Sequence, residues 1–117
     1  MKHILVVDDV PEIRFVYTEL FRQNDVTVLE AGDGCEALEI LDTSQVDLVL
    51  TDCQMPHMTG IELMRVAQER FPELPFIVVS STAREEDMTG LTPYAVMPKP
   101  FKLSELKAAV GTVLGGL

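Results

Sequence analysis

Short apolar stretches alternate with longer amphipathic ones along this chain of 117 residues. The short stretches are rich in Val, Ile and Leu and contain few polar positions, which is typical of strands buried on both faces of a parallel sheet. Five strands are therefore expected, at residues 3–7, 26–30, 46–52, 75–80 and 94–97.

The amphipathic stretches between these strands carry apolar residues at helical spacing. In the first stretch, Ile13, Val16 and Leu20 share one face. Pro11 suits the first turn of this helix, because the amide hydrogen that proline lacks would have no partner there. The stretch 83–90 is polar with poor apolar spacing, so a short or loosely packed helix is expected in it. Clear apolar spacing predicts further helices near residues 34–41, 61–71 and 103–113.

Strands that alternate with helices imply right-handed crossovers, so the expected fold class is α/β, with a five-stranded parallel sheet covered on both faces. The length suits one domain, residues 1–117, because single domains most often contain about 100–150 residues. With 47% apolar and 24% charged residues, the composition excludes a disordered chain. No apolar run approaches the ~20 residues that span a bilayer, so membrane insertion is not expected.

Acidic residues dominate the charge, since 19 Asp and Glu against 9 Lys and Arg give a net charge of −10. A negative surface repels polyanions, so direct nucleic-acid binding is not expected. Cys35 and Cys53 form no C-x-x-C motif and are interpreted as two small buried residues. Free cysteines fit a reducing compartment, and a cytoplasmic location is expected.

Charged or hydroxyl side chains stand where the predicted strands end. Asp8 and Asp9 follow the first strand, Asp52 ends the third, Ser80 ends the fourth, and Lys99 comes just after the fifth. Ligands of open α/β sheets bind beyond the carboxyl ends of the strands. We therefore expect these five side chains at one edge of the sheet.

Three carboxylates gathered at one edge favour a bound cation, because their like charges repel one another. Oxygen ligands without His or Cys beside them favour Mg²⁺. Lys99 would supply a second positive charge next to this cluster. A carboxylate held between a metal ion and an ammonium group, with a hydroxyl close by, is equipped to attack phosphorus as a covalent nucleophile. The residues therefore predict Mg²⁺-dependent phosphoryl transfer.

The same residues, taken together, resemble the receiver domain of two-component response regulators. The resemblance covers the whole chain and implies a flavodoxin-like, doubly wound sheet of strand order 2-1-3-4-5. It is carried by Asp8-Asp9, by Asp47-x-x-x-x-Asp52-x-x-Met55-Pro56-x-Met58-x-Gly60, by Ser80 and by Lys99-Pro100-Phe101.

The resemblance implies a role for each residue of an Mg²⁺ site. Asp9 matches the direct ligand of the ion, and Asp8 matches the residue that holds it mainly through water. Asp52 and the backbone carbonyl of Gln54 would complete the share of the protein.

It also implies how the chain handles a phosphoryl group. Asp52 matches the acceptor that takes this group from the phosphohistidine of a sensor histidine kinase or a phosphotransfer protein. Lys99 matches the lysine that pairs with the acceptor and later with the phosphoryl oxygens, and Ser80 matches the switch hydroxyl. The chain would then be a phospho-acceptor switch with self-catalysed phosphorylation and dephosphorylation, rather than an enzyme that acts on other molecules.

Two features depart from the family pattern, and one follows it. The interval from Ser80 to Lys99 is short, so the fourth helix of the family is expected to be shortened. Val96 stands where many members carry an aromatic switch residue, and Tyr94 lies two residues earlier, where its ability to substitute is left open. The bond after the matching lysine is commonly cis in the family, so a cis Lys99–Pro100 bond is expected.

The preferred hypothesis is a single-domain response regulator that switches the binding of an unidentified downstream protein. A receiver cut from a larger hybrid kinase or transcriptional regulator is the first alternative. An Mg²⁺-dependent aspartyl phosphatase is a weaker one, because such enzymes place a D-x-D at one strand end, whereas here Asp8 and Asp9 are adjacent. His57 is interpreted as an exposed loop residue, since no second His is spaced to help it bind a metal.

Overall fold

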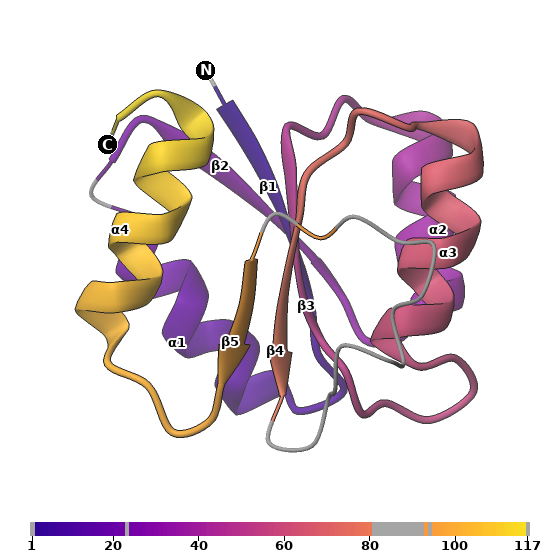
Figure 1. The fold of residues 1–117 in the computed structure, drawn as a ribbon, viewed down its shortest axis with the longest axis horizontal. Helices are drawn as coiled ribbons and strands as arrows, with labels where there is room; N and C mark the ends of the chain where they lie inside the picture. The colour runs from indigo at the N-terminus through magenta and orange to yellow at the C-terminus, as the bar shows by residue number, and fades with distance from the viewer. Residues whose placement is uncertain (1, 23, 81–92, 94, 117) are drawn as a thin grey trace.

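The computed structural model describes residues 2–22, 24–80, 93 and 95–116. Within these ranges the chain forms five strands and four helices (Figure 1). The elements in chain order are β1 (Lys2–Val7), α1 (Pro11–Phe21), β2 (Val26–Ala31), α2 (Gly34–Thr43), β3 (Leu48–Asp52), α3 (Gly60–Arg70), β4 (Phe76–Ser80), β5 (Ala95–Pro98) and α4 (Leu103–Leu114).

All neighbouring strands of the sheet are parallel, and their order is β2-β1-β3-β4-β5. Helices α2 and α3 cover one face of the sheet, whereas α1 and α4 cover the other (Figure 1). The strand order reverses between β1 and β3, which is where the ligand crevice of a doubly wound sheet lies. The expected fold class, a flavodoxin-like α/β sheet of this order, is confirmed.

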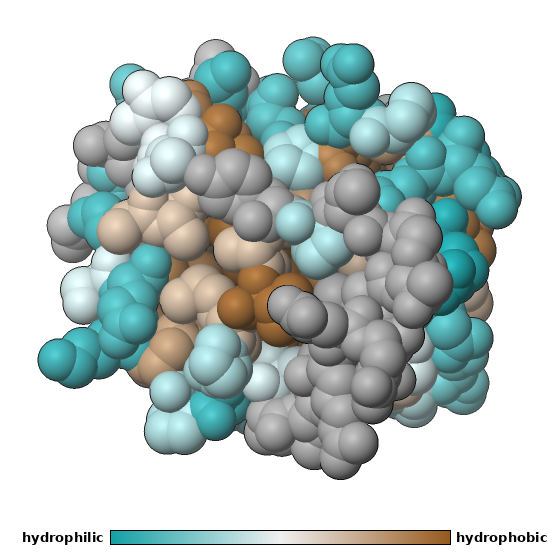
Figure 2. Space-filling view, viewed as in Figure 1, coloured by the Kyte–Doolittle hydropathy of each residue, from teal (hydrophilic) through white to brown (hydrophobic). Residues whose placement is uncertain are grey.

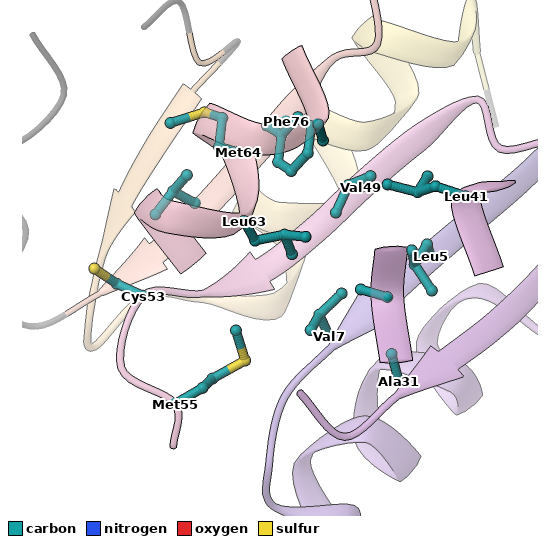
Figure 3. Close-up of a cluster of buried hydrophobic side chains, with 13 residues drawn as sticks. Leu5, Val7, Ala31, Leu41, Val49, Cys53, Met55, Leu63, Met64 and Phe76 are labelled. Carbon is teal, nitrogen blue, oxygen red and sulfur yellow. The ribbon is translucent and has the colours of Figure 1, made fainter. Parts of the chain in front are cut away.

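Alternate residues of the central strands point into two separate apolar cores. In β1, Leu5 and Val7 face α2 and α3, while Ile4 and Val6 face α1 and α4. The first of these cores is drawn in Figure 3, where buried side chains of the strands meet those of the helices. Because β1, β3 and β4 are buried on both sides, their carboxyl ends are held firmly, and the residues that follow them inherit fixed positions.

Local signals define where the helices begin. Pro11 opens α1 as expected from its missing amide hydrogen. The Asp33 carboxylate caps α2 by accepting from the Glu36 amide. Thr59 and Glu62 form a capping box at the start of α3, so this helix begins at a fixed point just after the loop that follows Asp52.

Several strand bounds differ by one or two residues from the sequence-based expectations, and the burial of one cysteine differs as well. Strand β3 begins at Leu48 rather than at residue 46, because the Asp47 carboxylate accepts from the His3 amide at 2.7 Å and replaces a regular strand contact there. Cys35 is exposed on the first turn of α2, whereas Cys53 is buried, so the prediction of two buried cysteines is wrong for Cys35.

Some expectations fall on parts of the chain that are not described. The predicted short helix near residues 83–90, and with it the shortened fourth helix of the family, lies outside the described residues, as does Tyr94. His57 is an exposed loop residue, as expected, and it has a positive φ of 70°. No described helix combines the length and the apolar character that crossing a membrane requires.

Candidate metal and phosphoryl-transfer site

Three carboxylates converge at the carboxyl edge of the sheet. Asp8 directly follows β1, Asp9 comes next, and Asp52 ends β3, the neighbour of β1. One oxygen from each of these side chains lies within 4.8 Å of the others. The central strands therefore bring together acidic residues that are more than forty positions apart in the sequence.

Lys99 faces the same cluster from the end of β5. Its Nζ atom lies 3.4 Å from Oδ1 of Asp52, and both side chains are partly shielded from solvent. The Lys99 amide donates to the Ser80 carbonyl at 3.0 Å, which ties the lysine to the end of β4. The peptide bond between Lys99 and Pro100 is cis, as expected from the resemblance.

Ser80 and Gln54 occupy the same edge of the sheet. Ser80 is buried at the end of β4, one residue beyond Val79, which lies opposite Asp52 in the strand register. Gln54 is exposed in the loop two residues after Asp52. The fold thus places all the candidate residues at one end of the sheet, and the close contacts join Asp8, Asp9, Asp52 and Lys99.

The electrostatics of the cluster are unfavourable for the Asp8 carboxylate. Burial raises the pKa of Asp8 above its ordinary value of 3.8, and the negative charges of Asp52 and Asp9 raise it further. The Val10 amide, which donates to Asp8 Oδ1 at 2.9 Å, and the Lys99 charge lower this pKa but do not reverse the shift. The single ammonium group of Lys99 therefore does not balance the negative charge of the three carboxylates.

The donor set fits a hard divalent cation. All the side-chain ligands are carboxylate oxygens, with neither His nor Cys in the group. Mg²⁺ prefers oxygen ligands and keeps several waters. One or two protein carboxylates, together with an oxygen of a phosphoryl group, therefore suffice to bind it. A bound cation would also offset the mutual repulsion that raises the pKa of Asp8.

We expect Asp8→Asn to stabilise the chain in EDTA at neutral pH. Because the folded-state pKa of Asp8 is raised, its contribution to stability is fully present below the unfolded pKa and is lost as pH rises through the folded pKa. The variant removes this loss, so its free energy of unfolding should exceed that of the wild type and depend less on pH above 4. Urea unfolding in EDTA across this pH range measures the difference.

Mg²⁺ should stabilise the wild type more than it stabilises Asp8→Asn. At ten times its Kd it should stabilise the wild type by about 1.4 kcal/mol, because it binds only the folded state. Asp8→Asn should lose most of this gain. Equal Mg²⁺ stabilisation of both proteins would show that Asp8 takes no part in binding the ion.

Two residues next to the site were given no structural role from the sequence, although Gly60 belongs to the motif that carries the resemblance. Gly60, the first residue of α3, packs so closely on the end of β3 that a Cβ there would overlap the Asp52 carbonyl oxygen. Arg14 of α1 donates to the Asp8 carbonyl at 2.6 Å and to Glu30 Oε1 at 3.1 Å. The only signals for them were a Gly at the end of the Asp52 motif and an Arg one helical turn after Pro11.

An apolar groove of about 610 Å³ opens beside Lys99. Tyr17 forms part of its wall, and burial together with the charges of Asp8 and Asp52 raises the pKa of Tyr17 to about 12, so its hydroxyl stays protonated at neutral pH. The surface around β5 and toward α4 is largely apolar, while the side formed by α2 and α3 is hydrophilic (Figure 2). The groove is lined by Ile13, Val16, Tyr17, Lys99, Pro100, Phe101 and Leu103.

Residues 4–111 match the family model described as the response regulator receiver domain. The chain belongs to this family. As a receiver, it is 36% identical over 115 residues to the chemotaxis protein CheY of Pseudomonas aeruginosa, covering 92% of this chain and 91% of CheY. It is 34% identical over 116 residues to the sensor kinase CckA of Brucella abortus, covering 95% of this chain but only 12% of CckA. The receiver therefore spans nearly all of one relative and a small part of another.

Solved receiver structures share the same fold. A CheY-like receiver domain from Methanospirillum hungatei superposes with a TM-score of 0.91 at 25% identity, covering 98% of this chain and 94% of that one. The response regulator TrrA from Thermotoga maritima, solved in complex with Mg²⁺-BeF, superposes with a TM-score of 0.88 at 29% identity, covering 97% and 99%. Receiver domains in general act as phospho-acceptor switches, and this chain belongs to that family.

Proposed function

We propose that Asp52 accepts a phosphoryl group and that Asp8, Asp9, Asp52 and the Gln54 backbone carbonyl hold the Mg²⁺ ion that this reaction needs. One observation supports the proposal above the rest: three carboxylates converge, and Lys99 pairs with Asp52 at 3.4 Å. A bound Mg²⁺ would neutralise negative charge on the phosphoryl oxygens. The Mg²⁺-BeF complex of TrrA, a receiver of the same fold, is consistent with such a site.

The residues of the chain have clear tasks in this transfer. An Asp52 carboxylate oxygen forms a bond to phosphorus, the bond from phosphorus to the donor nitrogen breaks, and its electrons remain on the imidazole of the donor histidine. Lys99 first holds the Asp52 carboxylate in place and then pairs with a phosphoryl oxygen. The product is an aspartyl phosphate, and its hydrolysis by water returns the chain to its starting state.

We infer that Ser80 is the switch hydroxyl. Its position at the buried end of β4 would allow it to donate to a phosphoryl oxygen on Asp52, because β3 and β4 are neighbours. Val96, 40% exposed on β5, has no polar or aromatic group with which to follow this movement. The conformational response of this receiver would therefore depend on Ser80 and Lys99 more than on an aromatic residue at Val96.

The donor that fits this site is a sensor histidine kinase or a phosphotransfer protein, because both carry phosphohistidine. We propose that the chain works as a cytoplasmic single-domain regulator that changes its binding to a downstream protein. The match over 91% of CheY supports this, whereas the CckA match keeps open a receiver within a longer protein. An immunoblot of source cells should show a band near 13.0 kDa if the chain is a single-domain regulator. A much larger band would favour a receiver within a longer protein.

Counting phosphoryl groups separates the switch from an aspartyl phosphatase. With acetyl phosphate and Mg²⁺, we expect at most one phosphoryl group per chain by intact mass, retained after rapid removal of the donor. With p-nitrophenyl phosphate, we expect no sustained release of product. Release of many product equivalents per chain would show that the phosphatase alternative is correct.

A further inference from the structure

Arg14 joins three parts of the chain next to the carboxylate cluster. It lies on the first turns of α1, donates from one guanidinium nitrogen to the Asp8 carbonyl at 2.6 Å, and donates from Nε to Glu30 at the end of β2 at 3.1 Å. Its side chain is only 19% exposed. A planar guanidinium that makes two such bonds has little freedom to move.

The carbonyl that Arg14 holds belongs to the peptide bond between Asp8 and Asp9. A peptide unit is planar, so fixing the position of its oxygen also fixes the direction in which the chain enters Asp9. The turn is further held by the Asp8 amide, which donates to the Ala31 carbonyl at 3.1 Å, and by the Val10 amide, which donates to the Asp8 carboxylate. Of these three contacts, only that of Arg14 comes from a side chain outside the turn.

Asp9 depends on this arrangement more than its neighbour does. Asp8 is buried and accepts a backbone hydrogen bond, whereas Asp9 is exposed. Among the described residues, no hydrogen bond or ion pair holds the Asp9 carboxylate. The backbone sets the position from which this side chain extends, and the contact with Arg14 restrains that backbone.

We propose that Arg14, held by Glu30, is a positioning residue that orients the Asp8–Asp9 turn for divalent-cation binding. The inference rests on the proposed Mg²⁺ site. It assigns to the Arg14 side chain, which contacts none of the ligand oxygens, the role of orienting the ligands. Groups that orient metal ligands in this indirect way typically change metal affinity by about 10–100-fold when they are removed.

Electrostatics alone predicts the opposite effect, which makes the proposal easy to test. A positive charge near a divalent cation repels it, so removing Arg14 should tighten Mg²⁺ binding if charge is all that matters. If positioning dominates, Arg14→Met should weaken binding despite the loss of that charge. Arg14→Lys keeps the charge but not the rigid two-pronged geometry, so charge alone predicts no change, whereas positioning predicts weaker binding.

The measurement is the Mg²⁺ Kd of the full chain, taken from an NMR amide-shift titration with magnesium chloride at constant ionic strength. Arg22→Met is the matched control, because it removes the same charge from the far end of α1, where Arg22 pairs with Glu19. We expect the Kd to rise about tenfold for Arg14→Met. It should rise less for Arg14→Lys and stay unchanged for Arg22→Met.

The results distinguish a positioning role of Arg14 from a charge effect and from a merely structural role. The free energy of unfolding in EDTA, measured in parallel, detects a merely structural role, which would lower stability and leave the Kd unchanged. An unchanged or lower Kd in Arg14→Met overturns the inference, and if that variant does not fold, an unchanged Kd in Arg14→Lys does so. If the wild type shows no saturable Mg²⁺ binding, the proposed metal site itself fails, and this inference fails with it.

Discussion

Asp52→Asn should abolish phosphorylation of the chain by acetyl phosphate and Mg²⁺. Asparagine keeps the shape of the side chain and one oxygen, but its amide is a poor nucleophile and carries no charge to pair with Lys99, which lies 3.4 Å from Asp52 in the wild type. We expect the wild type to gain up to one phosphoryl group per chain and the variant to gain none. Intact mass spectrometry of both proteins after the same incubation gives this result directly.

Asp47→Asn is the matched control for this experiment. It makes the same chemical change at the opposite end of β3, where an asparagine oxygen can still accept from the His3 amide. The control should be phosphorylated like the wild type. Equal labelling of Asp52→Asn and the wild type would falsify the acceptor assignment, and loss of labelling in Asp47→Asn would show that the test responds to general damage.

Of the substitutions proposed for this chain, Gly60→Ala should lower the free energy of unfolding most. A Cβ at this position would overlap the Asp52 carbonyl oxygen and would lie 3.0 Å from its carbonyl carbon and 3.1 Å from the Cys53 Cα. These are backbone atoms of a buried strand end, so they cannot move aside as a flexible side chain would. We expect a loss of roughly 3 kcal/mol, the upper end of the usual cost of overpacking, out of a typical total of about 5–15 kcal/mol.

This substitution should also disturb the site, since the strand end that must shift carries Asp52. Slower labelling by acetyl phosphate is therefore expected under conditions in which the variant is still folded. Gly32→Ala is the matched control, because a Cβ there meets its nearest neighbours at 3.6 and 3.7 Å, which is ordinary contact. Urea unfolding of the three proteins measures the loss, and equal stability of Gly60→Ala and Gly32→Ala would contradict the close packing described for Gly60.

Much of the site could be predicted because strands end where their apolar runs end. Val7 is the last apolar residue of β1, so Asp8 had to lie at its carboxyl edge, and the same reasoning placed Asp52 after Leu50 and Thr51. In a parallel sheet these ends lie side by side. The hydrophobic pattern therefore placed the three acidic residues at one edge of the sheet, while the strand order that makes β1 and β3 neighbours came from the family resemblance.

Other features depend on contacts that no local pattern encodes. The approach of Gly60 to the Asp52 carbonyl depends on the path of the loop between β3 and α3. The bond from Arg14 to the Asp8 carbonyl depends on how α1 packs against the ends of β1 and β2. The late start of β3 follows from the contact between Asp47 and His3, which are more than forty residues apart. Tertiary packing decides all three, so only the folded chain shows them.

The most direct test of the central claim identifies the residue that carries the phosphoryl group. After incubation with acetyl phosphate and Mg²⁺, sodium borohydride reduces an aspartyl phosphate to homoserine, which peptide sequencing by mass spectrometry locates. The account predicts homoserine at position 52 and at no other, and no conversion when EDTA replaces Mg²⁺. Homoserine at another aspartate, or equal conversion in EDTA, would contradict it.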